Sequence, residues 1–306
     1  MSAAEQSQAT PAPGAGPVFG AMGFAVLALA FSSIFITQLE RTSVPPLAIA
    51  FYRMAFATAL LLPASLRFKW AELAALRRKD IAMLALGGFC LAVHFGAWIT
   101  SLKYIPIAAS VVLVNSHPLF VVFASYLFLG EKPRRQSLVG TAIGLGGMAV
   151  MSSGGFKEVG VALAGDGLAL LGALAVVGYF IVGRLARARI SLLGYVTPLY
   201  GVCSLFLLLW AVAVRAPLYP YNGMVWIYLL ALAVVPTILG HTVFNWAIRH
   251  VRPSTISLAF LGEPVVASLL ALIFFAQNPP LATVLGGALV LGGVYLTSTA
   301  KDSPVD

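Results

Sequence analysis

Residues 94–106 read HFGAWITSLKYIP, and residues 241–253 read HTVFNWAIRHVRP. The first and last letters coincide, which places His94 and Pro106 on His241 and Pro253 at an offset of 147 residues. After the loss of one residue, further matches follow at an offset of 146, and they join Pro118, Phe128, Gly140, Leu145, Gly146 and Gly147 to Pro264, Phe274, Gly286, Leu291, Gly292 and Gly293. Because His, Pro and Gly coincide as well as apolar residues, we infer that the two halves of the chain are related.

The composition is that of a membrane protein. Of the 306 residues, 60% are hydrophobic and 9% are charged, and the mean hydropathy is +0.95. Soluble domains have about 45–50% apolar and about 25% charged residues, so a soluble globule and a disordered chain are both excluded. The two cysteines, Cys90 and Cys203, lie inside apolar runs, which excludes a disulfide scaffold.

The apolar residues form stretches of membrane-spanning length. About 18 to 20 apolar residues cross the hydrocarbon core as a helix, because a helix satisfies its own backbone groups in lipid. The sequence predicts ten such spans joined by short loops, at residues 18–38, 45–66, 81–102, 106–129, 137–153, 166–185, 193–214, 223–247, 254–276 and 281–298.

The number of spans in each half determines how the halves are related. Each half holds five spans, so the second half must enter the membrane from the opposite side. The predicted fold is an all-α polytopic membrane protein with ten transmembrane helices, arranged as two inverted five-helix repeats around a central cavity. Inverted repeats are typical of secondary transporters, which bind substrate near the bilayer midplane. The expected divisions are a disordered tail (1–17), the two repeats (18–153 and 166–298) and a short tail (299–306).

The net charge of +9 is distributed unevenly over the loops. Lys and Arg concentrate in cytoplasmic loops. With the N-terminus inside, fourteen of the nineteen lie in inner loops or the C-terminal tail, four lie in outer loops, and Arg53 lies within a span. We therefore expect both termini to be cytoplasmic. The first seventeen residues hold no Lys or Arg, so we expect a retained first helix rather than a signal peptide.

Several features together resemble the drug/metabolite transporter superfamily in its ten-helix, EamA-type form. They are Arg53 in the second span, FLGE at residues 128–131, GEP at residues 262–264, and glycine-rich fifth and tenth spans. Within that family the chain looks most like the bacterial aromatic amino acid exporters of the YddG group. The resemblance implies export of amino acids through a central cavity in the bacterial inner (plasma) membrane. The second half departs from the pattern where Ala276-Gln277 replaces Gly-Glu.

Ionisable residues inside spans are candidates for gating or coupling, because each costs about 2.5 to 3.5 kcal/mol at a helix centre. Arg53 offers a planar fork suited to a substrate carboxylate, or it forms a structural ion pair. Glu263 precedes Pro264, so a helix kink is expected beside an acidic group, and His117-Pro118 is the counterpart in the first half. These kinks are structural bends or gate hinges, and Glu263 is a candidate to bind a substrate ammonium or a coupled proton.

Polar and aromatic residues at helical spacing predict the lining of the cavity. His94 and Trp98 are four residues apart, as are His241 and Asn245, so each pair shares a helix face. The substrate-binding candidates are His94, Trp98, Asn115, Tyr200, His241, Asn245 and Trp246. Aromatic walls with a few Asn and His groups suit a zwitterion with an apolar side chain. The competing interpretation is that these residues hold helices together or anchor them at the interface.

Gly140 and Gly144 form a G-x-x-x-G pattern, which predicts close helix packing within one monomer or between two. No Walker A, H-E-x-x-H or G-x-S-x-G sequence is present, so an ATP-driven pump within this chain is excluded. We expect no metal, no cofactor and no nucleic acid partner. An intramembrane enzyme using the scattered histidines and Glu263, a haem protein ligated by His94 and His241, and a passive channel are the other classes considered.

The sequence thus favours a secondary transporter that exports amino acids, aromatic and other neutral ones such as threonine or methionine, by alternating access. The alternative within transporters is an exporter of drugs, cationic dyes or nucleoside-type metabolites. The expected partners are small-molecule substrates and the lipid bilayer, in a monomer or a homodimer. Proton coupling and facilitated diffusion both remain open.

Overall fold

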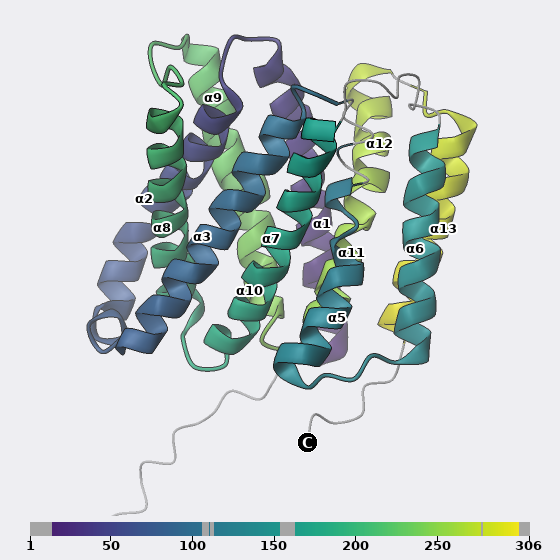
Figure 1. Ribbon diagram of the computed structural model, residues 1–306, viewed down its shortest axis with the longest axis horizontal. Coiled ribbons are helices and arrows are strands. Elements are labelled where there is room, and N and C mark those ends of the chain that lie inside the picture. Colours follow the sequence, from purple (N-terminus) through teal and green to yellow (C-terminus); the bar gives the residue numbers. More distant parts are fainter. Residues whose placement is uncertain (1–13, 106–109, 111–112, 154–162, 277, 300–306) are drawn as a thin grey trace, which may run out of the picture.

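The computed structural model describes residues 14–105, 110, 113–153, 163–276 and 278–299, and all regular structure within these residues is helical (Figure 1). The helices of the first half are α1 (Ala15–Glu40), α2 (Pro46–Ala74), α3 (Arg78–Ser101), α5 (His117–Leu129) and α6 (Arg135–Ser153). Those of the second half are α7 (Leu163–Arg187), α8 (Leu192–Ala213), α9 (Gly223–Leu232), η1 (Ala233–His241), α10 (Thr242–Ala247), α11 (Pro253–Phe260), α12 (Gly262–Phe275) and α13 (Leu281–Ser298).

Seven of the ten expected spans are confirmed, within the described residues, as helices long and apolar enough to cross a membrane. They are α1, α2, α3, α7, α8, the run α9–η1–α10 and the run α11–α12. The fourth expected span is described only in part, and its helix α5 and the tenth helix α13 are shorter apolar helices. The fifth, α6, has 19 residues. That α5, α6 and α13 also cross the membrane stays a prediction. The seven confirmed spans make this a multi-pass membrane protein, helical throughout its described regular structure.

Local sequence signals explain where several helices begin and end. Proline occupies the first turn of α2, α5 and α11, where its missing N–H costs no hydrogen bond. The side chains of Ser191 and Asn222 accept hydrogen bonds from Gly194 N and Val225 N at the starts of α8 and α9. At the other end of α5, Gly130 closes the helix in the left-handed conformation.

Two of the spans in the second half are interrupted. In the eighth, η1 is a π-helix that contains Pro236, and the N–H of Thr242 donates to the carbonyl of Thr237, five residues back. In the ninth, α11 ends before Leu261, whose N–H donates to Leu258 O at 3.0 Å, and α12 begins afterwards with Pro264 in its first turn. The sequence predicts the interruption at Pro264 but not the π-helix, which commonly marks a functional site.

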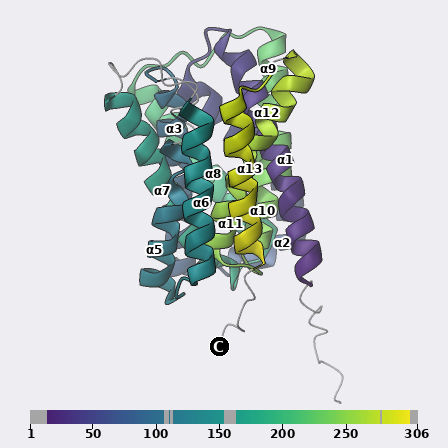
Figure 2. The ribbon, with the colours of Figure 1, turned by 90° about the vertical axis from the view of Figure 1, so that its right-hand side faces the viewer.

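Corresponding helices of the two halves pack against each other. α6 lies against α13, and α2 lies against α8, at opposite ends of the long axis of the molecule (Figure 1). Along α2, Ser65 Oγ donates to Leu193 O, whereas Tyr52 Oη donates to Leu218 O, so α2 and α8 run antiparallel. The start of α1 and the end of α13 lie at the same end of the helix bundle (Figure 2).

Glycines bring α6 and α13 into backbone contact. A methyl group on Gly140 would lie 2.7 Å from Gly293 O, and one on Gly147 would lie 2.6 Å from Gly286 O. The partner number falls as the α6 number rises, so these helices are also antiparallel. The close glycine packing predicted from Gly140 and Gly144 is therefore made within one chain.

Candidate functional site

Arg53 lies at the centre of a buried polar cluster. It comes from the first third of α2, its side chain is 1% exposed, and its Nε donates to Thr237 Oγ1 at 2.7 Å. The guanidinium carbon lies 4.3 Å from the centre of the Phe95 ring, which is cation–π geometry. Nη1 and Nη2 are buried, and neither has a hydrogen-bond partner among the described residues. Of the three guanidinium nitrogens, only Nε therefore has a hydrogen-bond partner in the described part of the chain.

The π-helix η1 supplies the partner of Arg53. Thr237 Oγ1 donates to Leu232 O at 2.8 Å, which leaves its lone pairs to accept from Arg53. The wider helical turn also sets the position of His241, the last residue of η1. The cluster therefore joins α2 of the first half to the interrupted eighth span of the second half.

Aromatic rings surround the arginine. Phe95 of α3 makes edge contact with the His241 ring at 5.3 Å, and His241 in turn lies 5.8 Å from Phe260. His94 is buried, and its Nδ1 lies 2.9 Å from Gly172 O on α7. The rings of His94 and His241, which the sequence repeat aligns, thus both contact the Phe95 ring, at 5.0 and 5.3 Å. His241 Nδ1 has no hydrogen-bond partner in the described part of the chain.

A second set of hydrogen bonds links α7, α8 and α10. Asn245 Nδ2 lies 2.6 Å from Tyr179 Oη and 3.4 Å from Tyr200 Oη, and Tyr200 Oη lies 3.0 Å from Thr242 Oγ1. Tyr200 is fully buried, and Asn245 is 3% exposed. Tyr200 and Tyr179 lie within electrostatic range of Arg53.

His117 and Glu263, the residues that precede Pro118 and Pro264, are associated with the α11–α12 span. His117 is buried, and its Nδ1 lies 2.6 Å from Ser257 Oγ on α11. Its ring lies 5.9 Å from that of Phe260. Glu263 is half-buried at the start of α12 and interacts electrostatically with Arg53, but it forms no direct ion pair with Arg53 in the described structure. Pro118 is buried, and Pro264 is half-buried.

The remaining predicted site residues are Trp98, Asn115 and Trp246. Trp98 stacks on His94 at 6.1 Å, and its buried Nε1 has no partner among the described residues. Asn115 is buried. Trp246 contacts the ring of His250 at 5.0 Å, toward the loop that follows α10.

Sequence reasoning missed Phe95, Tyr179, Thr237 and Ser257. Phe95 and Tyr179 stand among other aromatic and apolar residues in α3 and α7, and nothing in the local pattern separates them from core residues. Pro236 in the middle of a span was the available signal for Thr237, because a proline there removes a helical hydrogen bond. Within the described residues, no group of three His, Cys, Asp or Glu side chains is placed to hold a metal ion.

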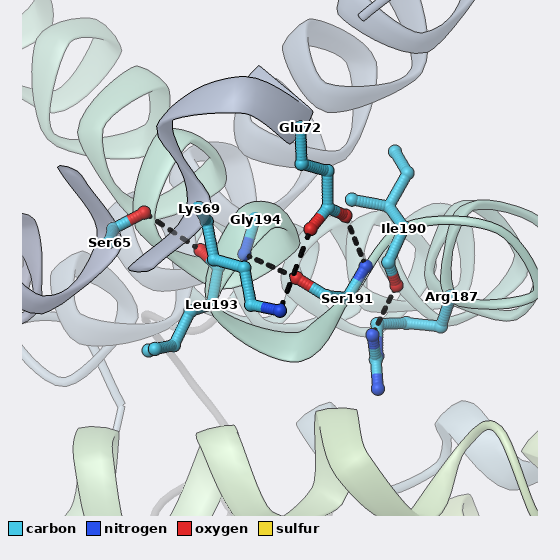
Figure 3. Close-up of polar contacts among 8 residues, drawn as sticks. All are labelled: Ser65, Lys69, Glu72, Arg187, Ile190, Ser191, Leu193 and Gly194. Atoms are coloured by element: carbon cyan, nitrogen blue, oxygen red, sulfur yellow. Dashed lines mark hydrogen bonds and ion pairs between the residues drawn. The ribbon is translucent and has the colours of Figure 1, made fainter. Parts of the chain in front are cut away.

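A second polar network joins the end of α2 to the end of α7 and the start of α8 (Figure 3). Glu72 at the end of α2 accepts a hydrogen bond from Ser191 N at 2.6 Å and pairs with Lys69 at 4.0 Å. Arg187 at the end of α7 donates through Nη1 to Ile190 O and through Nε to Asn245 O. These contacts fix the α7–α8 turn against α2 and α10.

Two ion pairs extend this network to other loops. Arg189 pairs with Asp80 at 3.1 Å, and Arg184 pairs with Glu131 at 3.4 Å. Glu72, Asp80 and Arg189 also border a pocket of about 240 Å³. Burial and the charges of nearby arginines lower the pKa of His250, which keeps that imidazole neutral near pH 7. We call the loops α2–α3, α5–α6, α7–α8 and α10–α11 together the basic end.

Comparison with known proteins adds relatives that are named as exporters. The chain is 26% identical over 263 residues to the pseudopaline exporter CntI of Pseudomonas aeruginosa, covering 85% of this chain and 88% of that protein. It is 26% identical to a probable terminal-alkyne amino-acid exporter of Streptantibioticus cattleyicolor, covering 72% and 74%. A solved crystal structure with 21% identity superimposes with a TM-score of 0.77 over 92% of this chain and 96% of the other, so the two share a fold.

The family comparison divides the chain in two. The model of the EamA-like transporter family matches residues 18–153 and again residues 163–299. Because these two matches together extend over most of the sequence, the protein belongs to the EamA-like transporter family.

Proposed function

We propose that this protein is a secondary transporter that exports amino acids or closely related small molecules from the cytoplasm by alternating access. Membership of a transporter family and the names of two relatives, a pseudopaline exporter and a probable amino-acid exporter, support the substrate class. The preference for aromatic and other neutral amino acids, which the likeness to the YddG group implies, is part of the proposal.

Alternating access rests on the inverted-repeat arrangement, which the packing supports. Gly140 lies against Gly293, and Gly147 lies against Gly286. Gly286 and Gly293 are the counterparts of Gly140 and Gly147, 146 residues later, so the two contacts are equivalent under the repeat. α3 packs on α7, and its counterpart, the eighth span, packs on α1, which is the counterpart of α7. In the same way α5 packs on α7, and its counterpart α12 packs on α1. Equivalent helices that run antiparallel are what two repeats of opposite orientation produce.

The single observation that carries the function is the polar cluster between the two halves. A fully buried arginine with two unpaired NH2 groups is expensive in any core, and more so inside a membrane. Arg53 belongs to the first matched stretch, whereas Thr237, His241, Asn245 and Glu263 belong to the second. A site shared by both halves is where a substrate is held while the halves move about it.

The orientation in the membrane is also proposed. The ion pairs of Arg184 and Arg189 hold the basic loops together at one end. Hydrogen bonds from Arg184 to Ile248 O and from Arg252 to Lys132 O add to them. By the positive-inside rule that end faces the cytoplasm, so both termini are cytoplasmic in a bacterial inner membrane. A reporter fused to the C-terminus that is active only in the cytoplasm tests this orientation, and activity of a periplasm-specific reporter there would reverse it.

The decisive experiment is counterflow in proteoliposomes. Vesicles preloaded with unlabelled amino acids are given labelled phenylalanine, threonine or methionine outside, with a nucleoside and a cationic dye as controls. We expect saturable uptake that depends on the internal amino acid. Uptake of only the dye or the nucleoside would replace the proposal with a drug or metabolite exporter, and no counterflow with any solute would reopen the channel and enzyme classes.

A further inference from the structure

The strongest unexplained feature of the interior is the unsatisfied part of Arg53. Nε is engaged by Thr237 and one face of the guanidinium by Phe95, which fixes the plane of the group. Nη1 and Nη2 together form the fork that matches a carboxylate in a bidentate manner, and both are buried without a hydrogen-bond partner in the described structure. The protein therefore holds a carboxylate-binding fork in place and gives it no hydrogen-bond acceptor among the described residues.

An acidic group within electrostatic range of this fork comes from the other half of the molecule. Glu263 interacts electrostatically with Arg53, yet no ion pair joins them in the described part of the chain. Glu263 is half-buried, at the break between α11 and α12, whereas Arg53 is 1% exposed on α2. Two opposite charges held apart inside a membrane protein lose most of their mutual stabilisation unless something lies between them.

A zwitterion has the complementary pair of charges. Its carboxylate matches the Nη1–Nη2 fork, and its ammonium matches the Glu263 carboxylate, so both buried charges gain a partner at once. The rings of Phe95, His241 and Phe260 near the arginine provide apolar surface for the remainder of the molecule. A simple cation leaves Arg53 unpaired, and a simple anion leaves Glu263 unpaired.

We propose that Arg53 and Glu263 together bind the two charged ends of an α-amino acid, with Arg53 holding the α-carboxylate and Glu263 holding the α-ammonium. This assignment rests on the proposed function and adds to it the requirement for both charged groups. Because the two residues come from different halves, bound substrate also links the halves, and an empty site leaves them without this link.

The test is competition in the phenylalanine counterflow assay. Unlabelled phenylalaninamide lacks the carboxylate, and N-acetylphenylalanine lacks the ammonium. In the unaltered protein we expect each to compete about tenfold or more weakly than phenylalanine, which is the range for losing a hydrogen bond to a charged group. Arg53→Gln is expected to abolish the discrimination against the amide only, and Glu263→Gln the discrimination against the acetyl compound only.

Controls separate this role from a structural one. Arg187 is another buried arginine, but its bonds go to backbone carbonyls at the basic end, so Arg187→Gln should leave both competition ratios unchanged. Arg53→Lys keeps the charge without the planar fork and is expected to bind phenylalanine more weakly while still preferring it to the amide. If Arg53→Gln does not fold, Arg53→Lys and Glu263→Gln still test which residue binds which end of the amino acid.

The outcomes are distinct. Counterflow of phenylalanine with equal competition by the amide or the acetyl compound in the unaltered protein would overturn this inference and leave the proposed function standing. Equal loss of both discriminations in either variant would assign Arg53 and Glu263 a structural role. Absence of counterflow for every amino acid would overturn the proposed function itself.

Discussion

At the scale of single residues, two equivalent positions differ in how well the residue fits the backbone. Gly130 has φ 69°, and Ala276, its counterpart 146 residues later, has φ 52°. An L-residue in this region costs roughly 1–2 kcal/mol, partly offset by the freer unfolded chain of glycine. We expect Ala276→Gly to raise the thermal unfolding temperature in detergent and Gly130→Ala, which meets no steric obstacle, to lower it. Shifts of the same sign in both variants would contradict this account.

The candidate site was only partly predictable at this scale. Arg53, Glu263 and the histidines could be found because a charge or imidazole in an apolar span is rare and costly. Thr237 and Phe95, which hold Arg53 in place, could not, since threonine and phenylalanine are ordinary residues in membrane helices. Trp246, a further aromatic candidate for the cavity lining, has its ring 5.0 Å from that of His250, and its role in binding stays a prediction.

At the scale of the helices, the contact between α6 and α13 allows a matched comparison. A methyl group on Gly293 would lie 2.4 Å from Gly140 O and 2.7 Å from Gly144 N, and backbone atoms cannot move aside cheaply. On neighbouring Gly292 the same methyl group would meet nothing within 4 Å. We expect Gly293→Ala to lower the free energy of unfolding by about 1–3 kcal/mol, and Gly292→Ala to leave it unchanged. Equal stability of the two variants would show that this interface is not close-packed.

The same scale shows where hydropathy stops being informative. It located the helices well because a long apolar stretch has no other stable structure in lipid. It did not show that α2 continues to Ala74, well beyond its apolar part. Nor did it resolve the eighth span into α9, η1 and α10, because mean hydropathy reports how apolar a stretch is and not its hydrogen-bond register.

At the scale of the whole molecule, the basic end is fastened by contacts between the two matched halves. Asp80 and Glu72 come from the first half, and their partners Arg189 and Ser191 N come from the second. The pair between Lys69 and Glu72 lies within a single helix. In an alternating-access cycle the contacts between halves must break when this end opens, whereas the contact within α2 persists.

Asp80→Asn should therefore favour opening at the basic end, and Lys69→Gln should not. Arg189 is partly exposed, so the lost pair is worth about 1 kcal/mol at most, or a few-fold change in population. Ile190 is buried beside Asp80 in the pocket at this end, and a cysteine introduced there, in a chain lacking Cys90 and Cys203, reports opening through its labelling rate with an impermeant maleimide. We expect Asp80→Asn to raise the labelling rate. Where the pair between Asp80 and Arg189 is intact, we expect added salt to raise the rate as well, because salt screens exposed charges. Equal labelling rates in both variants at every salt concentration would mean that the ion pair to Arg189 contributes nothing to keeping this end closed.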